Sequence, residues 1–224
     1  MDGNGRWAAS RRLPKIAGHR EGARAVRRTI EAAIQSGVAW LTIYAFSSEN
    51  WRRPAGEVLD LTGLLRQYLK NELAELKDNG VRLRVIGDRS RFDLDIQRDL
   101  AAAELETSAN SRLNLTVALS YGARDEIVGA ARKLAEAVRD GRLDPALIDA
   151  GRFSSALATT GIPDPDLVIR TSGEQRLSNF LLWQAAYAEL IFLDVLWPDF
   201  AAEHFGAALI EYARRERRFG ARPG

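Results

Sequence analysis

VAWLTIYAF, residues 38–46, decides the fold class of this 224-residue chain. The run is apolar at nearly every position, which is typical of a strand buried on both faces of a sheet. A helical pattern over residues 19–36 precedes it and ends at Gly37, and a second helical stripe of apolar residues follows from Val58 to Leu76. The strand therefore lies between two amphipathic helices.

The same alternation continues along the chain. Further strands are predicted at 81–86, 113–119, 166–170 and 190–195, further helices at 91–107, 124–139 and 200–218, and a segment that starts with proline at 145–158. Because strands that alternate with helices are joined by right-handed crossovers, they form a mostly parallel sheet. We therefore predict a single α/β domain over residues 1–224, with a mainly parallel central sheet flanked by helices.

Composition excludes several kinds of protein. The chain has no cysteine, which rules out disulfides, a thiol nucleophile and thiolate metal sites and favours a cytoplasmic location. Its only histidines, His19 and His204, cannot form a three-histidine metal centre. The net charge is +2, but residues 1–30 are strongly basic, which favours an anionic partner. The apolar run at 38–46 is too short for a membrane span, which needs about 20 residues.

Four polar loops follow predicted strands. They are SSENWRRP at 47–54, GDR at 87–89, SYGARDE at 120–126 and RTSGEQRLSN at 170–179. In an open parallel sheet, ligands bind beyond the carboxyl ends of the strands, so these loops should converge on one site. Their arginine, serine and asparagine side chains suit an anionic ligand.

Two segments are the main candidates for binding phosphate. In DGNGRW, residues 2–7, two glycines beside an asparagine and an arginine let successive backbone N–H groups point at one spot, although an ordinary turn is an alternative. In RTSGEQRLSN, Arg170 and Arg176 can share a diphosphate through two forked guanidinium groups, and a solvated loop is the alternative.

Three further features also have two interpretations. SSENWRRP either lines the site or is a capped helix start with Trp51 as a plug in the core. His19 either donates to a phosphate at the start of a helix or is structural. Glu189 follows an aromatic run and needs a partner or a cation. Mg²⁺ is such a cation, because it takes one or two carboxylates and phosphate oxygens.

Seven segments together resemble the cis-prenyltransferase family, most closely its bacterial undecaprenyl diphosphate synthases. In chain order they are DGNGRWA, GHREG, YAFSSENWRRP, RVIGD, SYGARDEI, DPDLVIRTSGEQRLSNFLLWQAAYAE and DVLWPDF. The resemblance covers nearly the whole chain. It implies a homodimer and an apolar tunnel for a growing isoprenoid.

The resemblance also implies an activity. Isopentenyl diphosphate would be added head-to-tail to an allylic diphosphate such as farnesyl diphosphate, with Mg²⁺ and cis geometry, to give a long product such as undecaprenyl diphosphate. No nucleic acid is expected as a partner, and peripheral membrane contact is expected at product release.

The resemblance carries roles onto individual residues. Asp2 would handle Mg²⁺ and the diphosphates, Glu189 would complete the metal environment, and Asn50 would assist proton removal. Because an amide is a poor base, we expect Asn50 to orient a phosphate oxygen or a water that takes the proton. The substrate-binding residues would be Gly3, Asn4, Gly5, Arg6, Trp7, Lys15 and His19 for the allylic diphosphate, Ser47, Ser48, Glu49, Trp51 and Arg53 along the site, and Arg170, Arg176, Leu177 and Ser178 for isopentenyl diphosphate.

Two departures from the family pattern give further expectations. Lys15 stands where the family usually has arginine, so we expect weaker binding of the allylic diphosphate than in a Lys15→Arg variant. Family members also carry an apolar strand directly before the Met-Asp pair, which here is Met1 and Asp2. We expect either a reading frame that starts upstream or a form with impaired activity.

Three alternatives stay open. A shorter-chain synthase is one, since tunnel depth should depend on side chains around Ala45, the helix at 57–79 and Leu113. A weakly active or inactive partner subunit of the same fold is the second. The third is a nucleic-acid-binding module, whose binding would weaken steeply with salt.

Overall fold

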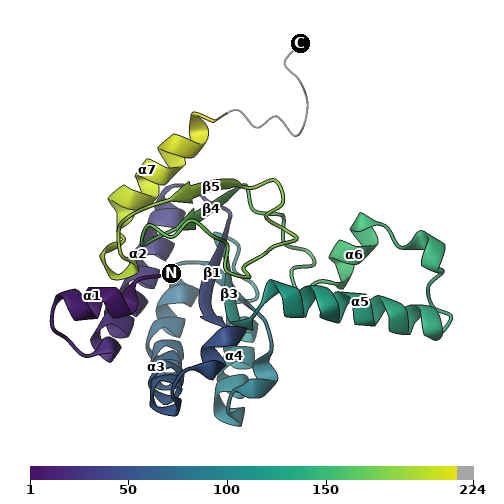
Figure 1. Cartoon of the computed structure of the whole chain (residues 1–224), viewed down its shortest axis with the longest axis horizontal. Coiled ribbons are helices and arrows are strands. Elements are labelled where there is room, and N and C mark those ends of the chain that lie inside the picture. Colours follow the sequence, from purple (N-terminus) through teal and green to yellow (C-terminus); the bar gives the residue numbers. More distant parts are fainter. Residues whose placement is uncertain (216–224) are drawn as a thin grey trace.

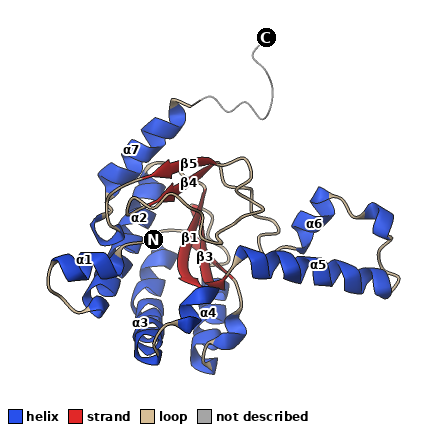
Figure 2. Cartoon of the chain, viewed as in Figure 1, coloured by secondary structure: helices blue, strands red, loops and turns tan. Residues whose placement is uncertain are grey.

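The computed structural model describes residues 1–215 as an α/β fold with strands inside and helices outside (Figures 1 and 2). The helices are α1 (Asn4–Ser10), α2 (Lys15–Gln35), α3 (Ala55–Asp78), α4 (Leu94–Glu106), α5 (Ala123–Arg139), α6 (Ala150–Ala156) and α7 (Ala202–Ala213). The strands are β1 (Trp40–Ser47), β2 (Val81–Ile86), β3 (Leu113–Tyr121), β4 (Leu167–Arg170) and β5 (Glu189–Phe192). Short 3₁₀ helices are η1 (Ser48–Arg52), η2 (Arg89–Arg91), η3 (Pro145–Leu147) and η4 (Trp197–Asp199).

The predicted alternation of helices and strands is confirmed, and the strand at 81–86 agrees residue for residue. The predicted helix at 200–218 is α7, and positions 216–218 of that prediction lie outside the described residues. Sequence reasoning missed α1, because the glycine-rich opening was interpreted as a loop. Gly3 makes a left-handed turn with φ of 100°, and the helix begins at the next residue.

The strands are all parallel, as predicted, but they form two sheets. The larger sheet has the order β1-β3-β2, and the smaller one pairs β4 with β5. The predicted mainly parallel α/β fold is therefore confirmed, with its strands divided between two sheets: within residues 1–215, no strand joins β1 to β4.

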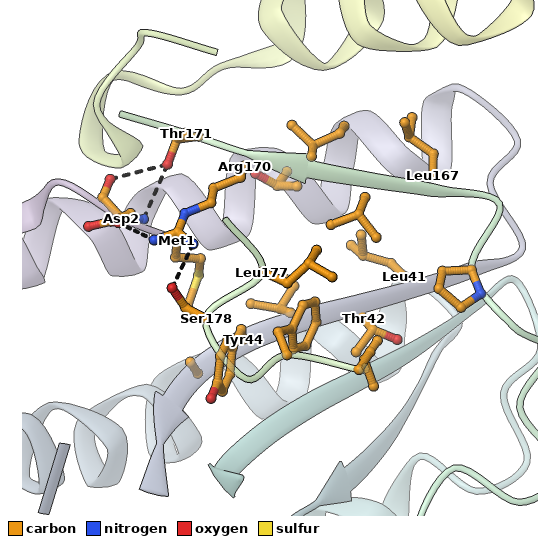
Figure 3. A pocket seen from close by; sticks show the side chains of 18 of the residues that line it. Met1, Asp2, Leu41, Thr42, Tyr44, Leu167, Arg170, Thr171, Leu177 and Ser178 are labelled. Atoms are coloured by element: carbon orange, nitrogen blue, oxygen red, sulfur yellow. Dashed lines mark hydrogen bonds and ion pairs between the residues drawn. The ribbon is translucent and has the colours of Figure 1, made fainter. Parts of the chain in front are cut away.

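A cavity of about 920 Å³ lies between the two sheets (Figure 3). Consecutive residues 38–45 of β1 and its approach line one side, and consecutive residues 163–171 line the other. Because successive side chains of a strand point to opposite faces, an unbroken run of lining residues means that the strand edges face the cavity. The cavity thus separates the outer edge of β1 from the outer edge of β4.

The larger sheet is buried on both faces, which accounts for its apolar strands. Ile43 and Phe46 of β1 join a main core with residues of α2, α3 and α4, whereas Tyr44 packs on the opposite face against a second cluster that contains Tyr121 and Leu181. Helices α5 and α6 extend away from this body (Figure 1). Along the described part of the chain, no helix combines the length and apolar character needed to cross a membrane.

Candidate active site

Asp2 is the meeting point of the chain's first residues and the loop after β4. Its carboxylate Oδ2 accepts a hydrogen bond from Arg170 Nη2 at 3.0 Å. Its backbone carbonyl accepts a hydrogen bond from the hydroxyl of Thr171 at 3.1 Å (Figure 3). The same carbonyl accepts from the hydroxyl of Ser172 at 2.5 Å and from Trp197 N at 2.9 Å. These bonds fix both the backbone and the side chain of Asp2 at the polar end of the cavity.

The Asp2 carboxylate is held in its charged form. Burial opposes ionisation, but the hydrogen bonds from Arg170 and from the backbone N–H of Gly3, together with the charges of Arg170 and Arg6, lower the pKa of Asp2. Arg6 Nη2 lies 3.6 Å from Asp2 Oδ1. The side chain is ionised at neutral pH and lies between two guanidinium groups.

The loop after β4 supplies the main cationic surface. Arg170, whose side chain is 15% exposed, donates to Ser178 Oγ at 2.7 Å and to the carbonyl of Arg176. Glu174 pairs with Arg176 at 2.5 Å and with Arg6 at 3.2 Å. A diphosphate bound here would compete with Glu174 for both arginines. Sequence reasoning missed Glu174, although its place in the chain near Arg176 was a usable signal.

Gly3 is required by close packing. A Cβ at this position would lie 2.3 Å from Ser172 Oγ and 2.8 Å from Leu196 Cδ2, and φ is 100°. Gly5 is different, since a Cβ added at its first-turn position in α1 would meet no described atom within 4 Å beyond its chain neighbours and the backbone of its own helix. The expected two-glycine loop is therefore one tight turn at Gly3 followed by a helix that carries Asn4, Gly5 and Arg6.

Asn4 and His19 form the contact between α1 and α2. Asn4 Nδ2 lies 3.4 Å from His19 Nδ1, and Asn4 Oδ1 is buried without a hydrogen-bond partner among residues 1–215. Burial and the charge of Arg53 lower the pKa of His19, against the opposing charge of Glu57. His19 is therefore neutral at pH 7 and can donate only one N–H to a ligand.

Glu57, near the start of α3, pairs with basic residues at the rim of the cavity between the two sheets. It accepts a hydrogen bond from Arg53 at 2.7 Å and pairs with Lys15 at 3.4 Å, and His19 Nε2 lies 4.0 Å away. Arg53 lines the cavity, whereas the Lys15 side chain is 70% exposed outside it. The i to i+4 spacing of Arg53 and Glu57 was the available sequence signal for this residue.

The loop after β1 is the short helix η1. Asn50 Oδ1 accepts a hydrogen bond from the backbone N–H of Ser47 at 3.0 Å, which orients the amide toward the cavity wall that both residues line. Trp51 instead donates to Ser120 Oγ at 2.9 Å and packs against Phe46 and Phe92. Trp51 therefore packs against the core, as the second of the two interpretations of SSENWRRP predicted.

Asn179 is a site residue that sequence reasoning missed. It has a φ of 64° and directly follows Ser178, whose φ is 49°. Its Nδ2 donates to Glu49 Oε1 at 2.8 Å, and its Oδ1 accepts from the backbone N–H of Arg124 at 2.8 Å. Asn179 thus ties the loop after β4 to η1 and to the start of α5. Asparagine tolerates left-handed backbone better than most residues, but the sequence did not show that such a turn was needed.

The structure gathers most of the predicted residues but not all. The cavity is lined by Asp2, Asn4, His19, Ser47, Glu49, Asn50, Arg53, Arg170, Arg176, Leu177 and Ser178. Outside its described lining lie Gly3, Gly5, Arg6, Trp7, Lys15, Ser48, Trp51 and Glu189. Gly3, Arg6, Lys15 and Ser48 still contact cavity residues or their neighbours. Trp7 is turned to the surface, where its Nε1 donates to Asp199 at 2.7 Å.

Glu189 does not meet Asp2 within one chain. It is the first residue of β5, opposite Leu167 in the register, whereas Asp2 lies beside Arg170 and Thr171 at the other end of β4. Its Oε2 pairs with Arg215 at 2.9 Å. No cluster of three or more histidine or acidic side chains suited to a metal exists among residues 1–215. Asp2 alone fits an ion that receives most of its oxygen ligands from diphosphate and water.

A second cavity, the apolar channel, lies between α2, α3 and the larger sheet. Its volume is about 160 Å³, and its walls include Val26, Ala45, Leu65, Leu69 and Leu73. Leu113 does not line it among the described residues, although Ala45 and the helix at 57–79 do, as expected. Asn4 and His19 line both this channel and the larger cavity between the two sheets, which we call the polar pocket. The channel therefore begins at the polar pocket.

These features define a class of α/β protein that can bind an anionic head group joined to an apolar tail. Residues 1–220 match the family described as "Putative undecaprenyl diphosphate synthase". An isoprenyl transferase of Zymomonas mobilis is 58% identical over 98% of this chain and 89% of its own length. A ditrans,polycis-undecaprenyl-diphosphate synthase ((2E,6E)-farnesyl-diphosphate specific) of Xanthomonas axonopodis pv. citri is 55% identical over 98% and 86%.

A solved structure is also similar to this chain over nearly its whole length. Lavandulyl diphosphate synthase from Lavandula x intermedia, in complex with dimethylallyl diphosphate, superposes with a TM-score of 0.95 at 38% identity over 98% of this chain and 95% of that one. The chain therefore belongs to the undecaprenyl diphosphate synthase family of isoprenyl transferases.

Proposed function

We propose that this chain adds isopentenyl diphosphate head-to-tail to an allylic diphosphate such as farnesyl diphosphate, forming cis double bonds and a long product such as undecaprenyl diphosphate. The observation that carries the proposal is that Asn4 and His19 line both the polar pocket and the apolar channel. An isoprenoid diphosphate has a charged head and a hydrocarbon tail, and it would need both compartments side by side. The family named above supports the same substrates.

The chemistry accounts for the basic residues. The bond between the allylic carbon and the diphosphate breaks with its electron pair leaving on oxygen, the alkene of isopentenyl diphosphate attacks the allylic carbon, and a proton is then lost. Arginine side chains stabilise the charge that grows on the leaving diphosphate. In this proposal Arg6 and Arg53 contact the allylic diphosphate, and Arg170, Arg176 and Ser178 contact isopentenyl diphosphate.

Asn50 is proposed to position the group that takes the proton. Its oxygen is already bonded to Ser47 N, so its Nδ2 donors can orient a phosphate oxygen or a water. The allylic cation must be kept from water, and the tail in the channel excludes water from one side.

Magnesium is proposed to be the cofactor, with Asp2 as its protein ligand and the diphosphate as the source of further oxygens. When bound, the ion would neutralise charge on the leaving diphosphate. Within one chain Glu189 is positioned to hold Arg215 rather than this ion. A role for Glu189 as a second metal ligand would therefore require Glu189 to come close to an Asp2 site, which a single protomer does not provide.

A shorter-chain product is the second candidate, and the size of the apolar channel favours it. An engineered cavity of about 150 Å³ holds a molecule of the size of benzene. The channel here is about 160 Å³ and must widen to hold a long polyprenyl tail. The inactive-subunit alternative is disfavoured, because Asp2, Asn50, Arg170 and Arg176 are all present around one pocket.

We also propose a homodimer located in the cytoplasm, with peripheral membrane contact at product release. Support for the dimer comes from exposed apolar side chains around the projecting α5 and α6, including Val128, Leu147 and Ile148. Light scattering of the purified chain tests this directly, and a monomer at micromolar concentration would contradict it.

Mass spectrometry of products from isopentenyl and farnesyl diphosphate, with and without Mg²⁺, tests the activity. We expect a series of polyprenyl diphosphates that depends on Mg²⁺. Absence of any condensation product would overturn the proposal.

A further inference from the structure

Glu174 joins two arginines that the proposed function assigns to different substrates. Its Oε1 lies 3.2 Å from Arg6 Nη2, and its Oε2 lies 2.5 Å from Arg176 Nη1. Arg6 is proposed to contact the allylic diphosphate, and Arg176 is proposed to contact isopentenyl diphosphate. One carboxylate group therefore bridges the two subsites that we propose for diphosphate.

The turn before Glu174 is fixed, but the side chain of Glu174 is not enclosed. Ser172 and Gly173 have φ values of 76° and 69°, and the backbone N–H of Gly173 donates to the carbonyl of Leu193 at 2.9 Å. The Glu174 side chain is 24% exposed, and its two arginine partners are 50% and 60% exposed. Glu174 can therefore exchange partners by rotation of its side chain, without a change in the backbone.

Arg6 and Arg176 depend on Glu174 to different degrees. Arg6 also lies 3.6 Å from Asp2 Oδ1 and donates to the carbonyl of Ser172 at 3.2 Å. Among residues 1–215, Glu174 is the only carboxylate paired with the Arg176 side chain. A guanidinium group binds the oxygens of carboxylates and of phosphates with the same fork of N–H donors. The Glu174 carboxylate therefore occupies positions on both arginines that diphosphate oxygens would take.

We infer that Glu174 is an internal competitor of diphosphate: it pairs with whichever of Arg6 and Arg176 is vacant and thereby promotes the release of pyrophosphate after each condensation. The inference rests on the proposed function. Each condensation leaves pyrophosphate beside Arg6, while the lengthened product keeps its diphosphate beside Arg176. When pyrophosphate leaves, Glu174 replaces its contacts with Arg6, so release costs less free energy than it would without this carboxylate.

Isothermal titration calorimetry with inorganic pyrophosphate, without divalent ions, tests the competition in Glu174→Gln. Glutamine keeps the size of the side chain and removes its charge, so pyrophosphate no longer has to displace a carboxylate. Because exposed ion pairs are individually weak, we expect the Kd of pyrophosphate to fall by roughly threefold to tenfold. Substitution of a residue that only supported the loop would have the opposite effect, because a loosened pocket binds pyrophosphate less tightly.

Glu21→Gln is the matched control for the loss of a bridging carboxylate. Glu21 pairs with Arg24 at 2.8 Å and with Arg28 at 3.0 Å, and its side chain is 21% exposed. It lies outside the described linings of both cavities. We expect this variant to bind pyrophosphate with unchanged affinity.

Asp194→Asn is the control for charge that acts at a distance. A Cβ on Gly173, the residue before Glu174, would lie 3.0 Å from Asp194 Oδ1, so Asp194 adds negative charge to the same turn. Within the described chain, Asp194 is paired with neither Arg6 nor Arg176. Because salt screens exposed charges, we expect this substitution to change the Kd by less than about twofold at about 0.15 M salt.

Unchanged or weaker binding of pyrophosphate by Glu174→Gln would overturn the inference. An equal gain in affinity for Asp194→Asn would also overturn it, because the loss of any nearby negative charge would then explain the result. Thermal unfolding of each variant checks that it folds.

Steady-state kinetics connects the competition to turnover. In Glu174→Gln we expect a lower KM for isopentenyl diphosphate together with a lower kcat, because tightly held pyrophosphate leaves more slowly. Inhibition by added pyrophosphate should strengthen by the same factor as the Kd falls. A raised KM would contradict the inference. Absence of condensation in the unaltered chain would contradict only the proposed activity, because the pyrophosphate titration needs no turnover.

Discussion

The polar pocket and the apolar channel share Asn4 and His19 but are built in opposite ways. The polar end of the pocket is formed by loops in which Ser172, Ser178 and Asn179 have positive φ values. The channel is formed by regular helices and strands whose apolar residues recur at helical and strand spacing. The pocket thus depends on strained, non-local contacts, and the channel depends on packing. Substitutions in the pocket should mainly change activity, and substitutions in the channel should mainly change stability.

The largest effect is expected at Asp2. Asp2→Asn removes the charge that pairs with Arg170 and that we propose for the metal, so kcat/KM in the condensation assay should fall by roughly a thousandfold. Asp199→Asn is the matched control, because Asp199 pairs with Trp7 and Arg11 outside the described cavity lining. If both variants lost activity equally, the pocket would not be the active site.

The channel gives the largest expected effect on stability. Leu69 is 9% exposed and lies on the channel wall, so Leu69→Ala should lower the free energy of unfolding by about 2 to 4 kcal/mol. Leu59→Ala on the same helix, at a position that is 68% exposed, should change it by less than about 0.5 kcal/mol. Urea unfolding measures both, and equal losses would contradict the packing argument.

Gly3 and Gly5 compare a position with strained backbone and close contacts with a position that has neither. Gly3→Ala forces a Cβ to within 2.3 Å of Ser172 Oγ at positive φ, so it should cost about 1 to 3 kcal/mol of stability. Gly5→Ala has free space among the described residues and lies in a helix, so it should be neutral or should stabilise by up to about 1 kcal/mol. A tolerated Gly3→Ala would mean that the tight turn is not needed.

Asn179 tests the connection between loops. Asn179→Ala removes the bonds to Glu49 and to the N–H of Arg124, so the KM for isopentenyl diphosphate should increase by about tenfold, as expected for one or two lost hydrogen bonds. Asn179→Gly keeps the backbone freedom and separates strain from bonding. Asn114→Ala, at the amino end of β3, is the control and should leave KM unchanged.

The smallest effect is expected at the rim. Lys15→Arg should lower the KM for the allylic diphosphate by about twofold, because arginine offers a planar fork but the position is 70% exposed. An unchanged KM would show that Lys15 makes no contact with this diphosphate.

The part of the molecule that the sequence predicted best is the part made of periodic elements. The apolar run at 38–46 and the stripe from Val58 to Leu76 identified β1 and α3, because side-chain spacing alone determines which face is buried. The parallel pairing followed from the alternation of elements. The division into two sheets did not, because pairing between β1 and β4 depends on what lies between them in space.

The pocket was predicted by residue type rather than by geometry. Arg170, Arg176 and Ser178 were found because phosphate chemistry favours them, and the structure places them around one cavity. Asn179 and Glu174 were missed, because their importance comes from partners that are distant in sequence, Glu49 and Arg6. Glu189 was placed with Asp2 by resemblance, and the register of β4 and β5 separates the two within a chain.

The free edges of β1 and β4 also affect how the protein behaves in concentrated solution. Unpaired strand edges on a protein surface recruit strands from other molecules and start aggregation. Here both edges face the same internal cavity, with Arg170 and Arg176 at its polar end. A strand from a neighbouring molecule would have to enter this cavity past Arg170 and Arg176 before it could pair. The arrangement that shapes the pocket therefore also shields these two edges, of β1 and β4, from pairing with another molecule.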